Sequence, residues 1–271
     1  MRELSATSRL LGGTARLPAP IDRLAGRLTN RWLRATPRRV IRVPNFEPIV
    51  SFTFDDVPDS ALRAGAAILE AHGARGTFYV AGGLEGRVEP DRRLIDAAGC
   101  RQLAAAGHEI GCHSYGHRNL RHVDRDLLTE DLRRNRHYLD AVDPRPSRRN
   151  FAYPYNSGAF GKRTMLAETF RTCRAGGDAI NRGPTDPTFL RAVEIRQPAD
   201  YVSGLTRWID MLVANPGWLI FFTHDISPTP TPYGCAPDAF QRLVRHAVEN
   251  GCRVLTVDAA LDRMGLREQT R

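Results

Sequence analysis

The stretch "PIVSFTFDD", residues 48–56, decides the fold. An apolar run of strand length over 48–54 ends on two adjacent carboxylates, Asp55 and Asp56. Neighbouring carboxylates repel each other, so a positive group must lie beside them: an arginine, a lysine or a metal ion. The stretch therefore predicts a buried strand that ends at a charged site.

This first strand begins a regular alternation of strands and helices. Further strands are predicted at 76–82, 108–114, 148–156, 172–177, 218–225 and 252–261. Helices are predicted at 60–73, 91–107, 125–142, 161–170, 201–217 and 237–251. Such an alternation indicates βα units, an α/β fold and a mostly parallel sheet. About seven units fit, which is close to a closed barrel, and in such folds the chemistry lies at the C-terminal ends of the strands.

The net charge of +9 is unevenly distributed along the chain. Residues 1–47 contain ten arginines and three acidic residues, and so account for +7 of it. We therefore divide the chain into a basic N-terminal extension, 1–47, and a catalytic domain, 48–271. Because the domain offers no basic continuation, nucleic-acid binding is not expected.

Residues 21–34 of the extension have the pattern of a short basic amphipathic helix. Arginines flank an apolar stripe with helical spacing, formed by Ile21, Leu24, Leu28 and Trp32. Two interpretations are open. The stripe packs on the catalytic body, which we favour, or it makes a peripheral contact with a membrane surface.

Cysteine usage and the N-terminal sequence favour a cytoplasmic protein. The five cysteines are scattered and form no C-x-x-C pair, which indicates neither a disulfide framework nor a thiolate zinc site. No stretch approaches the ~20 apolar residues of a membrane span, and the N-terminus lacks the apolar core of a secretory signal.

The motif "HSYGH", residues 113–117, brings two imidazoles four residues apart to one side of a turn. Alone, this spacing is weak, because two exposed or core histidines give the same pattern. Its position after a strand that ends in two aspartates favours a metal site. One carboxylate and two histidines leave open positions for water and substrate, a set that suits Zn²⁺ and also Co²⁺, Ni²⁺ or Fe²⁺.

Two further strand ends carry candidate residues. In "FFTHD", residues 221–225, His224 is either a structural histidine or a general acid across the site from Asp55. The turn "FAYPYN", residues 151–156, either caps the barrel or lines a groove and presents a backbone N–H to an oxyanion.

In this order the motifs resemble those of the polysaccharide deacetylase (NodB-homology) family of metal-dependent carbohydrate esterases and amidases. They are "TFDD" (53–56), "HSYGH" (113–117), "FAYPYN" (151–156) and "LIFFTHD" (219–225). The resemblance extends from residue 50 to about residue 260. It implies a distorted (β/α)7-type barrel, one divalent metal, and hydrolysis of an N-acetyl or sometimes O-acetyl group, usually on a glycan.

The resemblance also implies roles for individual residues. Asp55 would be the general base and His224 the general acid. The metal would be bound by Asp56, His113 and His117. The Tyr155 backbone N–H would help to hold the oxyanion, and Tyr153 and Pro154 of the same turn would contribute to substrate binding.

One position departs from the family pattern. Many members have an arginine in the third motif that pairs with the catalytic base, whereas Ala152 stands at that position here. Arg148 and Arg149 are near but out of register. What orients Asp55 is therefore left open.

The expected function is removal of the N-acetyl group from a sugar in a polysaccharide, lipopolysaccharide or glycoconjugate precursor. The expected partner is an N-acetylated carbohydrate inside the cell, with the basic helix on the inner face of the membrane. Two alternatives remain: hydrolysis of a formyl or non-sugar amide by the same residues, and a non-catalytic carbohydrate-binding relative.

Overall fold

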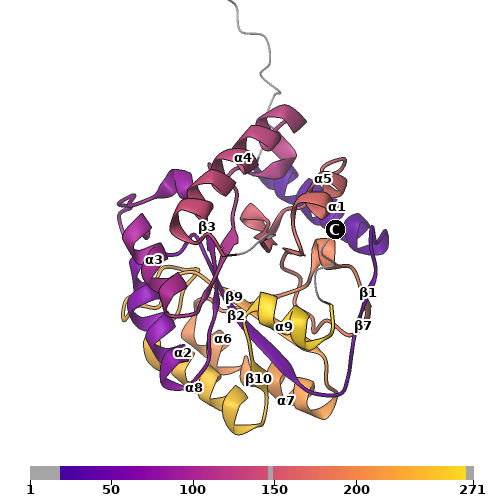
Figure 1. The fold of residues 1–271 in the computed structure, drawn as a ribbon. Helices are drawn as coiled ribbons and strands as arrows, with labels where there is room; N and C mark the ends of the chain where they lie inside the picture. The colour runs from indigo at the N-terminus through magenta and orange to yellow at the C-terminus, as the bar shows by residue number, and fades with distance from the viewer. Residues whose placement is uncertain (1–18, 146–148, 267–271) are drawn as a thin grey trace, which may run out of the picture.

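The structure is a computed structural model that describes residues 19–145 and 149–266 (Figure 1). Residues 1–18 of the predicted basic extension lie outside the described residues.

Parallel strands form one curved sheet in the order β6-β5-β4-β3-β2-β9-β8. Their bounds are β2 Ile49–Asp55, β3 Thr77–Val80, β4 Glu109–Cys112, β5 Phe151–Ala152, β6 Cys173–Arg174, β8 Val193–Glu194 and β9 Trp218–Thr223. Leu190 forms a parallel bridge with Arg174 of β6, and three residues later Val193 of β8 pairs with Phe221 of β9. The sheet therefore curls into a distorted barrel, which confirms the predicted fold class.

The helices surround this sheet (Figure 1). The α-helices are α1 Ala19–Ala35, α2 Ala67–Ala71, α3 Ala97–Ala105, α4 Arg125–Val142, α5 Arg163–Thr169, α6 Ala199–Ser203, α7 Thr206–Ala214, α8 Pro237–Glu249 and α9 Val257–Arg263. The π-helix η1 spans Ala61–Ala66, and single 3₁₀ turns are η2 Gly82–Leu84, η3 Leu120–His122, η4 Pro154–Asn156 and η5 Pro187–Phe189. Beside the barrel, β1 Ile41–Val43 pairs antiparallel with β7 Gly183–Thr185.

Strand β2 lies at the centre of the core because both of its edges are paired. One edge follows β9, and the other pairs first with β10 (Arg253–Val254) and then with β3. All seven residues of β2 are buried, and Phe54 stacks on Phe78 at 4.5 Å between ring centroids. The apolar run thus places Asp55 in the middle of the C-terminal end of the barrel.

Several predicted elements have different bounds in the structure; the helix expected at 201–217, for example, is divided into α6 and α7. The helix expected at 91–107 begins only at Ala97, because Asp96 caps it by accepting a hydrogen bond from the Gly99 N–H at 2.9 Å. The strand expected at 252–261 ends at Val254, and Thr256 then caps α9 in the same way.

Helix α1 confirms the predicted amphipathic helix but packs through an unexpected face. Gly26, Thr29 and Leu33 are buried against the barrel. The side chains of the apolar stripe, by contrast, are more than half exposed: Ile21, Leu24, Leu28 and Trp32. The favoured prediction, that this stripe packs on the catalytic body, is therefore wrong.

Replacing Gly111 of β4 with alanine is expected to destabilise the barrel by about 1–3 kcal/mol. An added Cβ would lie 2.6 Å from Cε1 of the fully buried Tyr79 ring, which has no room to move. Urea unfolding followed by circular dichroism measures the effect. Gly204→Ala is the matched control, because its Cβ would meet nothing closer than 3.5 Å and its φ is −82°. Equal midpoints for the two variants would contradict this packing.

Candidate active site

The C-terminal ends of the strands surround a cavity of about 560 Å³. It is lined by Asp55, Asp56, Leu84, Arg87, Glu89, Arg92, His113, Gly116, His117, Tyr155, Asn156, Glu194, His224 and Tyr233. All five residues predicted as base, acid and metal ligands are in this set. The parallel strands bring them together because their C-terminal ends share one edge of the sheet.

Asp56, His113 and His117 form a cluster whose ligand atoms all lie within 4.8 Å of one another. Asp56 Oδ1 is 3.2 Å from His117 Nε2 and 3.8 Å from His113 Nε2. This carboxylate oxygen is buried and has no hydrogen-bond partner among the described residues. A buried, unpartnered carboxylate oxygen facing two imidazole nitrogens fits a divalent cation, and these three residues could hold one.

The two histidines are in the form that binds metals. His113 Nδ1 lies 2.9 Å from the Ala152 carbonyl oxygen, which can only accept, so Nδ1 carries the hydrogen and Nε2 presents its lone pair to Asp56. Burial lowers the pKa of His113. Burial, together with the nearby His113, lowers the pKa of His117 to about 4. Both imidazoles are thus neutral near pH 7.

The two oxygens of Asp56 have different surroundings. Arg92, from the loop before α3, donates a hydrogen bond to Oδ2 at 3.1 Å, which leaves Oδ1 for a cation. Burial raises the pKa of Asp56, but electrostatic interactions with His117, His113, His224 and Arg92 outweigh burial and lower the pKa to about 2. Sequence analysis missed Arg92 because it lies in the stretch predicted to be helical.

Asp55 is held by Arg174 of β6. Nη2 of Arg174 lies 2.6 Å from Oδ1 and 2.5 Å from Oδ2 of Asp55, and the arginine is fully buried. Its Nη1 donates to Asn156 Oδ1 at 2.8 Å, and its guanidinium lies 4.6 Å from the centre of the Phe222 ring. The positive group beside Asp55 is therefore an arginine.

Arg174 also explains the departure at Ala152. The two residues are register partners across β5 and β6, so the arginine is displaced by one strand from the position that the family pattern suggests. An arginine within a buried strand was a signal in the sequence, because an unpaired buried charge is costly. Its partner was not readable, because Asp55 is 119 residues away.

The backbone is strained at this end of the barrel. Of the seven non-glycine residues with positive φ in the described ranges, six follow β2, β4 or β5: Asp56, Val57, Ser114, His117, Tyr155 and Asn156. Such conformations cost energy and persist where the surrounding structure enforces them, as is common at functional sites. Val57 is the clearest case, since a β-branched residue has a φ of 52°.

The loop that carries the two histidines is anchored by Asp131 of α4. Its carboxylate is buried and accepts hydrogen bonds from the Tyr115 N–H at 2.6 Å and the Gly116 N–H at 2.9 Å. Asp131 thereby fixes the path between His113 and His117. The signal in the sequence was an acidic residue on the same helix face as Leu128 and Leu132, which we did not interpret.

His224 lies across the cavity from the histidine loop. Its Nδ1 is 3.3 Å from the Tyr233 carbonyl oxygen and its Nε2 is 4.0 Å from Asp56 Oδ2. The Pro-rich loop that carries Tyr233 is held by Asp225, which accepts a hydrogen bond from the Thr231 N–H at 2.8 Å. Glu194 of β8 lines the same wall; burial raises its pKa, which the charges of Arg196 and His224 oppose.

The turn after β5 contributes less than expected. Tyr155 lines the cavity and is 64% exposed. Tyr153 is instead buried in the core, where its hydroxyl donates to the Thr188 carbonyl at 3.1 Å, and Pro154 is buried as well. Neither lines the cavity, so the structure gives no support to their predicted role in substrate binding.

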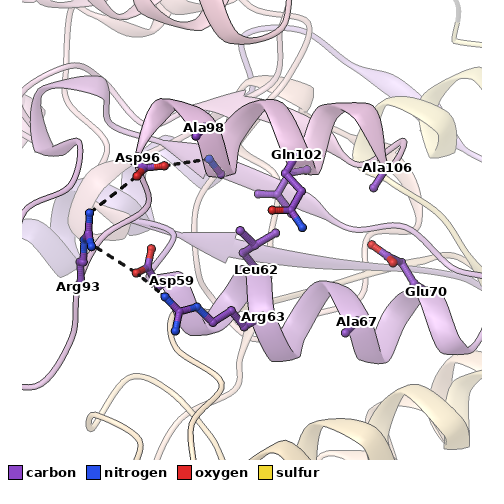
Figure 2. Close-up of a pocket in the computed structure, with 12 residues that line it drawn as sticks. Asp59, Leu62, Arg63, Ala67, Glu70, Arg93, Asp96, Ala98, Gln102 and Ala106 are labelled. Atoms are coloured by element: carbon purple, nitrogen blue, oxygen red, sulfur yellow. Dashed lines mark hydrogen bonds and ion pairs between the residues drawn. The ribbon is translucent and has the colours of Figure 1, made fainter.

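A second hollow, of about 490 Å³, lies between η1/α2 and α3 on the outside of the barrel (Figure 2). All of its charged residues have partners: Asp59 lies 3.3 Å from Arg63, Arg93 lies 3.8 Å from Asp96, and Glu70 lies 2.9 Å from His108. No histidine or cysteine lines it. This groove offers no catalytic chemistry, and the barrel-end cavity is the candidate site.

Comparison with known proteins agrees with this choice. Residues 42–169 match the sequence profile of the family described as polysaccharide deacetylase. This part of the chain belongs to the polysaccharide deacetylase family. A peptidoglycan-N-acetylglucosamine deacetylase of Bacillus cereus is 30% identical to this chain over 106 residues, which make up 39% of this chain and 46% of the relative. The alignment thus spans less than half of that relative's length.

Solved structures of this family have the same fold. A CE4 family pseudoenzyme from Bacillus anthracis has a TM-score of 0.59 at 20% identity, covering 84% of this chain and 70% of that one. A family 4 acetyl xylan esterase from Clostridium thermocellum, in complex with a cobalt ion, has a TM-score of 0.54 at 20% identity, covering 81% and 93%. A peptidoglycan N-acetylglucosamine deacetylase has a TM-score of 0.56 at 17% identity, covering 80% and 90%.

Proposed function

We propose that this protein is a metal-dependent deacetylase that hydrolyses the N-acetyl group of a sugar in a polysaccharide, lipopolysaccharide or glycoconjugate precursor. The observation that carries the proposal is the convergence of two aspartates and three histidines on one cavity: Asp55, Asp56, His113, His117 and His224. The deacetylase family and the curated relative support the type of reaction.

Asp56, His113 and His117 would hold one divalent cation. Their one-oxygen, two-nitrogen set suits Zn²⁺ best, and Co²⁺, Ni²⁺ or Fe²⁺ are also compatible. When bound, such a cation acts as a Lewis acid on the amide carbonyl and lowers the pKa of a coordinated water.

The residues around the cation would handle the protons. Asp55, fixed by its ion pair with Arg174, would accept a proton as water attacks the amide carbon. His224 would give a proton to the departing amine from Nε2, because Nδ1 faces the Tyr233 carbonyl. Tyr155 lines the cavity, and its backbone N–H would help to hold the oxyanion.

We further propose that the protein acts inside the cell. Its five cysteines support this, because all are buried thiols and none forms a disulfide. No helix in the described ranges is both long and apolar enough to cross a bilayer. An intracellular enzyme of this kind would act on a precursor of the glycan.

Binding without turnover is the main competing function, because a CE4 family pseudoenzyme shares the fold. The presence of all five principal residues in one cavity favours catalysis over binding alone. Hydrolysis of a formyl amide would use the same residues and differ only in the group released.

The test is release of acetate and formate from a panel of N-acetylated and N-formylated sugars and oligosaccharides by the zinc-loaded protein. We expect acetate release, abolished in Asp55→Asn although that variant keeps its metal. If formate is the main product, the protein is a deformylase and the proposed deacetylase function is wrong. If calorimetry shows that the sugars bind but neither acid is released, the protein is a non-catalytic carbohydrate-binding relative.

A further inference from the structure

Helix α1 presents an apolar surface to the solvent. Four of its side chains are 51–58% exposed: Ile21, Leu24, Leu28 and Trp32. At 3.6 residues per turn they fall within an arc of roughly 80°. Phe160, which is 54% exposed, extends this surface, because its ring contacts Trp32 edge to face at 4.7 Å between centroids. We name these five residues the α1 patch.

The exposed charged residues of α1 are all arginines. Arg23, Arg27 and Arg31 are exposed along one side of it, and none has an ion pair with a described residue. The single acid of α1, Asp22, is directed to the body of the protein, where it binds Arg121 at 2.5 Å and His122 at 2.9 Å. The outward face of α1 is thus apolar and basic.

We propose that the α1 patch docks on the surface of an anionic lipid bilayer. Large apolar side chains beside a row of arginines match a helix that lies in the membrane interface, with its apolar face in the acyl boundary and its guanidinium groups on lipid phosphates. A second copy of the chain is a poorer occupant. A two-fold contact with antiparallel helices would place the unpaired arginines of one copy beside those of the other.

Other residues of α1 tie this helix to the loops beside the active-site cavity. Asn30 of α1 donates a hydrogen bond to the Asn156 carbonyl at 2.8 Å and accepts one from the Gly158 N–H at 3.0 Å. Arg34 donates to the Gly176 carbonyl at 3.1 Å. These partners belong to the loops after β5 and β6, and Asn156 lines the cavity. Docking through α1 would therefore hold the mouth of the cavity near the lipid headgroups.

Co-sedimentation of the full chain with vesicles tests this proposal. We expect binding to vesicles of 30% phosphatidylglycerol in phosphatidylcholine, and at least tenfold weaker binding to phosphatidylcholine alone. Leu28→Ser combined with Trp32→Ser is expected to weaken binding at least tenfold. Met211→Ser on α7 is the matched control, since this side chain is 49% exposed and far in sequence from α1.

A second pair of variants separates the basic row from overall charge. Arg27→Gln combined with Arg31→Gln should weaken binding to the anionic vesicles several-fold. Arg242→Gln combined with Arg245→Gln removes the same charge from exposed positions of α8. This pair should leave vesicle binding unchanged, because it lies outside the α1 patch. Equal effects of the two pairs would overturn the proposal, as attraction would then depend on net charge alone.

Fluorescence gives an independent readout of insertion. Trp218 is fully buried and Trp208 is partly buried, so Trp32 is the tryptophan that lipids can reach. Brominated lipids should quench its emission in wild type, and Trp32→Ser should remove the quenching. Absence of binding and quenching in wild type would overturn membrane docking. Concentration-dependent dimerisation that Trp32→Ser abolishes would assign the α1 patch to a second copy instead.

Discussion

Replacing Arg174 with alanine is expected to lower kcat by about 100-fold or more while the bound metal is retained. The ion pair at 2.5–2.6 Å fixes the carboxylate of Asp55, and a catalytic group displaced by about 1 Å can cost 10²-fold in rate. In the described part of the chain, Arg174 makes no hydrogen bond or ion pair with Asp56, His113 or His117, so metal content should be unchanged. Acetate release and elemental analysis measure the two quantities.

Two double variants separate positioning from stability. Arg174→Ala alone leaves a buried carboxylate unpaired and should cost about 3–5 kcal/mol of folding free energy. Asp55→Asn combined with Arg174→Ala removes both charges and should recover much of that loss, but no activity. Ala152→Arg combined with Arg174→Ala should recover a measurable part of kcat, because Ala152 is the register partner of Arg174. Full activity in Arg174→Ala would contradict the positioning role.

His113→Ala and His117→Ala are expected to reduce bound metal from about one ion per chain to less than a tenth of that value. Each removes one of the three proposed metal ligands, and even the loss of a residue that only orients a ligand costs 10–100-fold in metal affinity. The measurement is elemental mass spectrometry after dialysis against metal-free buffer. Catalytic activity should disappear in parallel.

Two controls make this series specific. Asp55→Asn should keep its metal and lose activity, which separates the base from the ligands. His246→Ala on α8 should keep both, because His246 pairs with Asp210 at 2.7 Å and does not line the cavity. A full metal complement in His113→Ala would contradict the ligand assignment. Absence of metal in wild type after reconstitution would contradict the site itself.

The sequence was sufficient where the signal is local. The apolar run 48–54 predicts a buried strand, and such a strand places Asp55 and Asp56 at its end. The spacing of His113 and His117 within one turn predicts a common ligand position, and the structure confirms that cluster. Parallel strands then bring His224 to the same edge, although it is more than 100 residues away.

The sequence was insufficient where a contact depends on how two strands pair or on which face of a helix packs. The pairing of β5 with β6 involves two residues of each strand, too few to read from a pattern, so Arg174 could not be assigned to Asp55. Amphipathic spacing predicts the stripe of α1 but does not say which face packs. Here Gly26 lets α1 approach closely, because an added Cβ would lie 2.6 Å from Arg121 Nη1.

A motif search that requires arginine at the position of Ala152 would misclassify this chain as lacking part of its catalytic apparatus. The guanidinium is present, supplied by the neighbouring strand. Adjacent strands lie about 4.8 Å apart, so a long arginine side chain on either of two neighbouring strands can bring its charge to the same carboxylate. Homologues in which the third motif is altered are therefore better compared by the positions of charged groups in superposed structures than by sequence alignment.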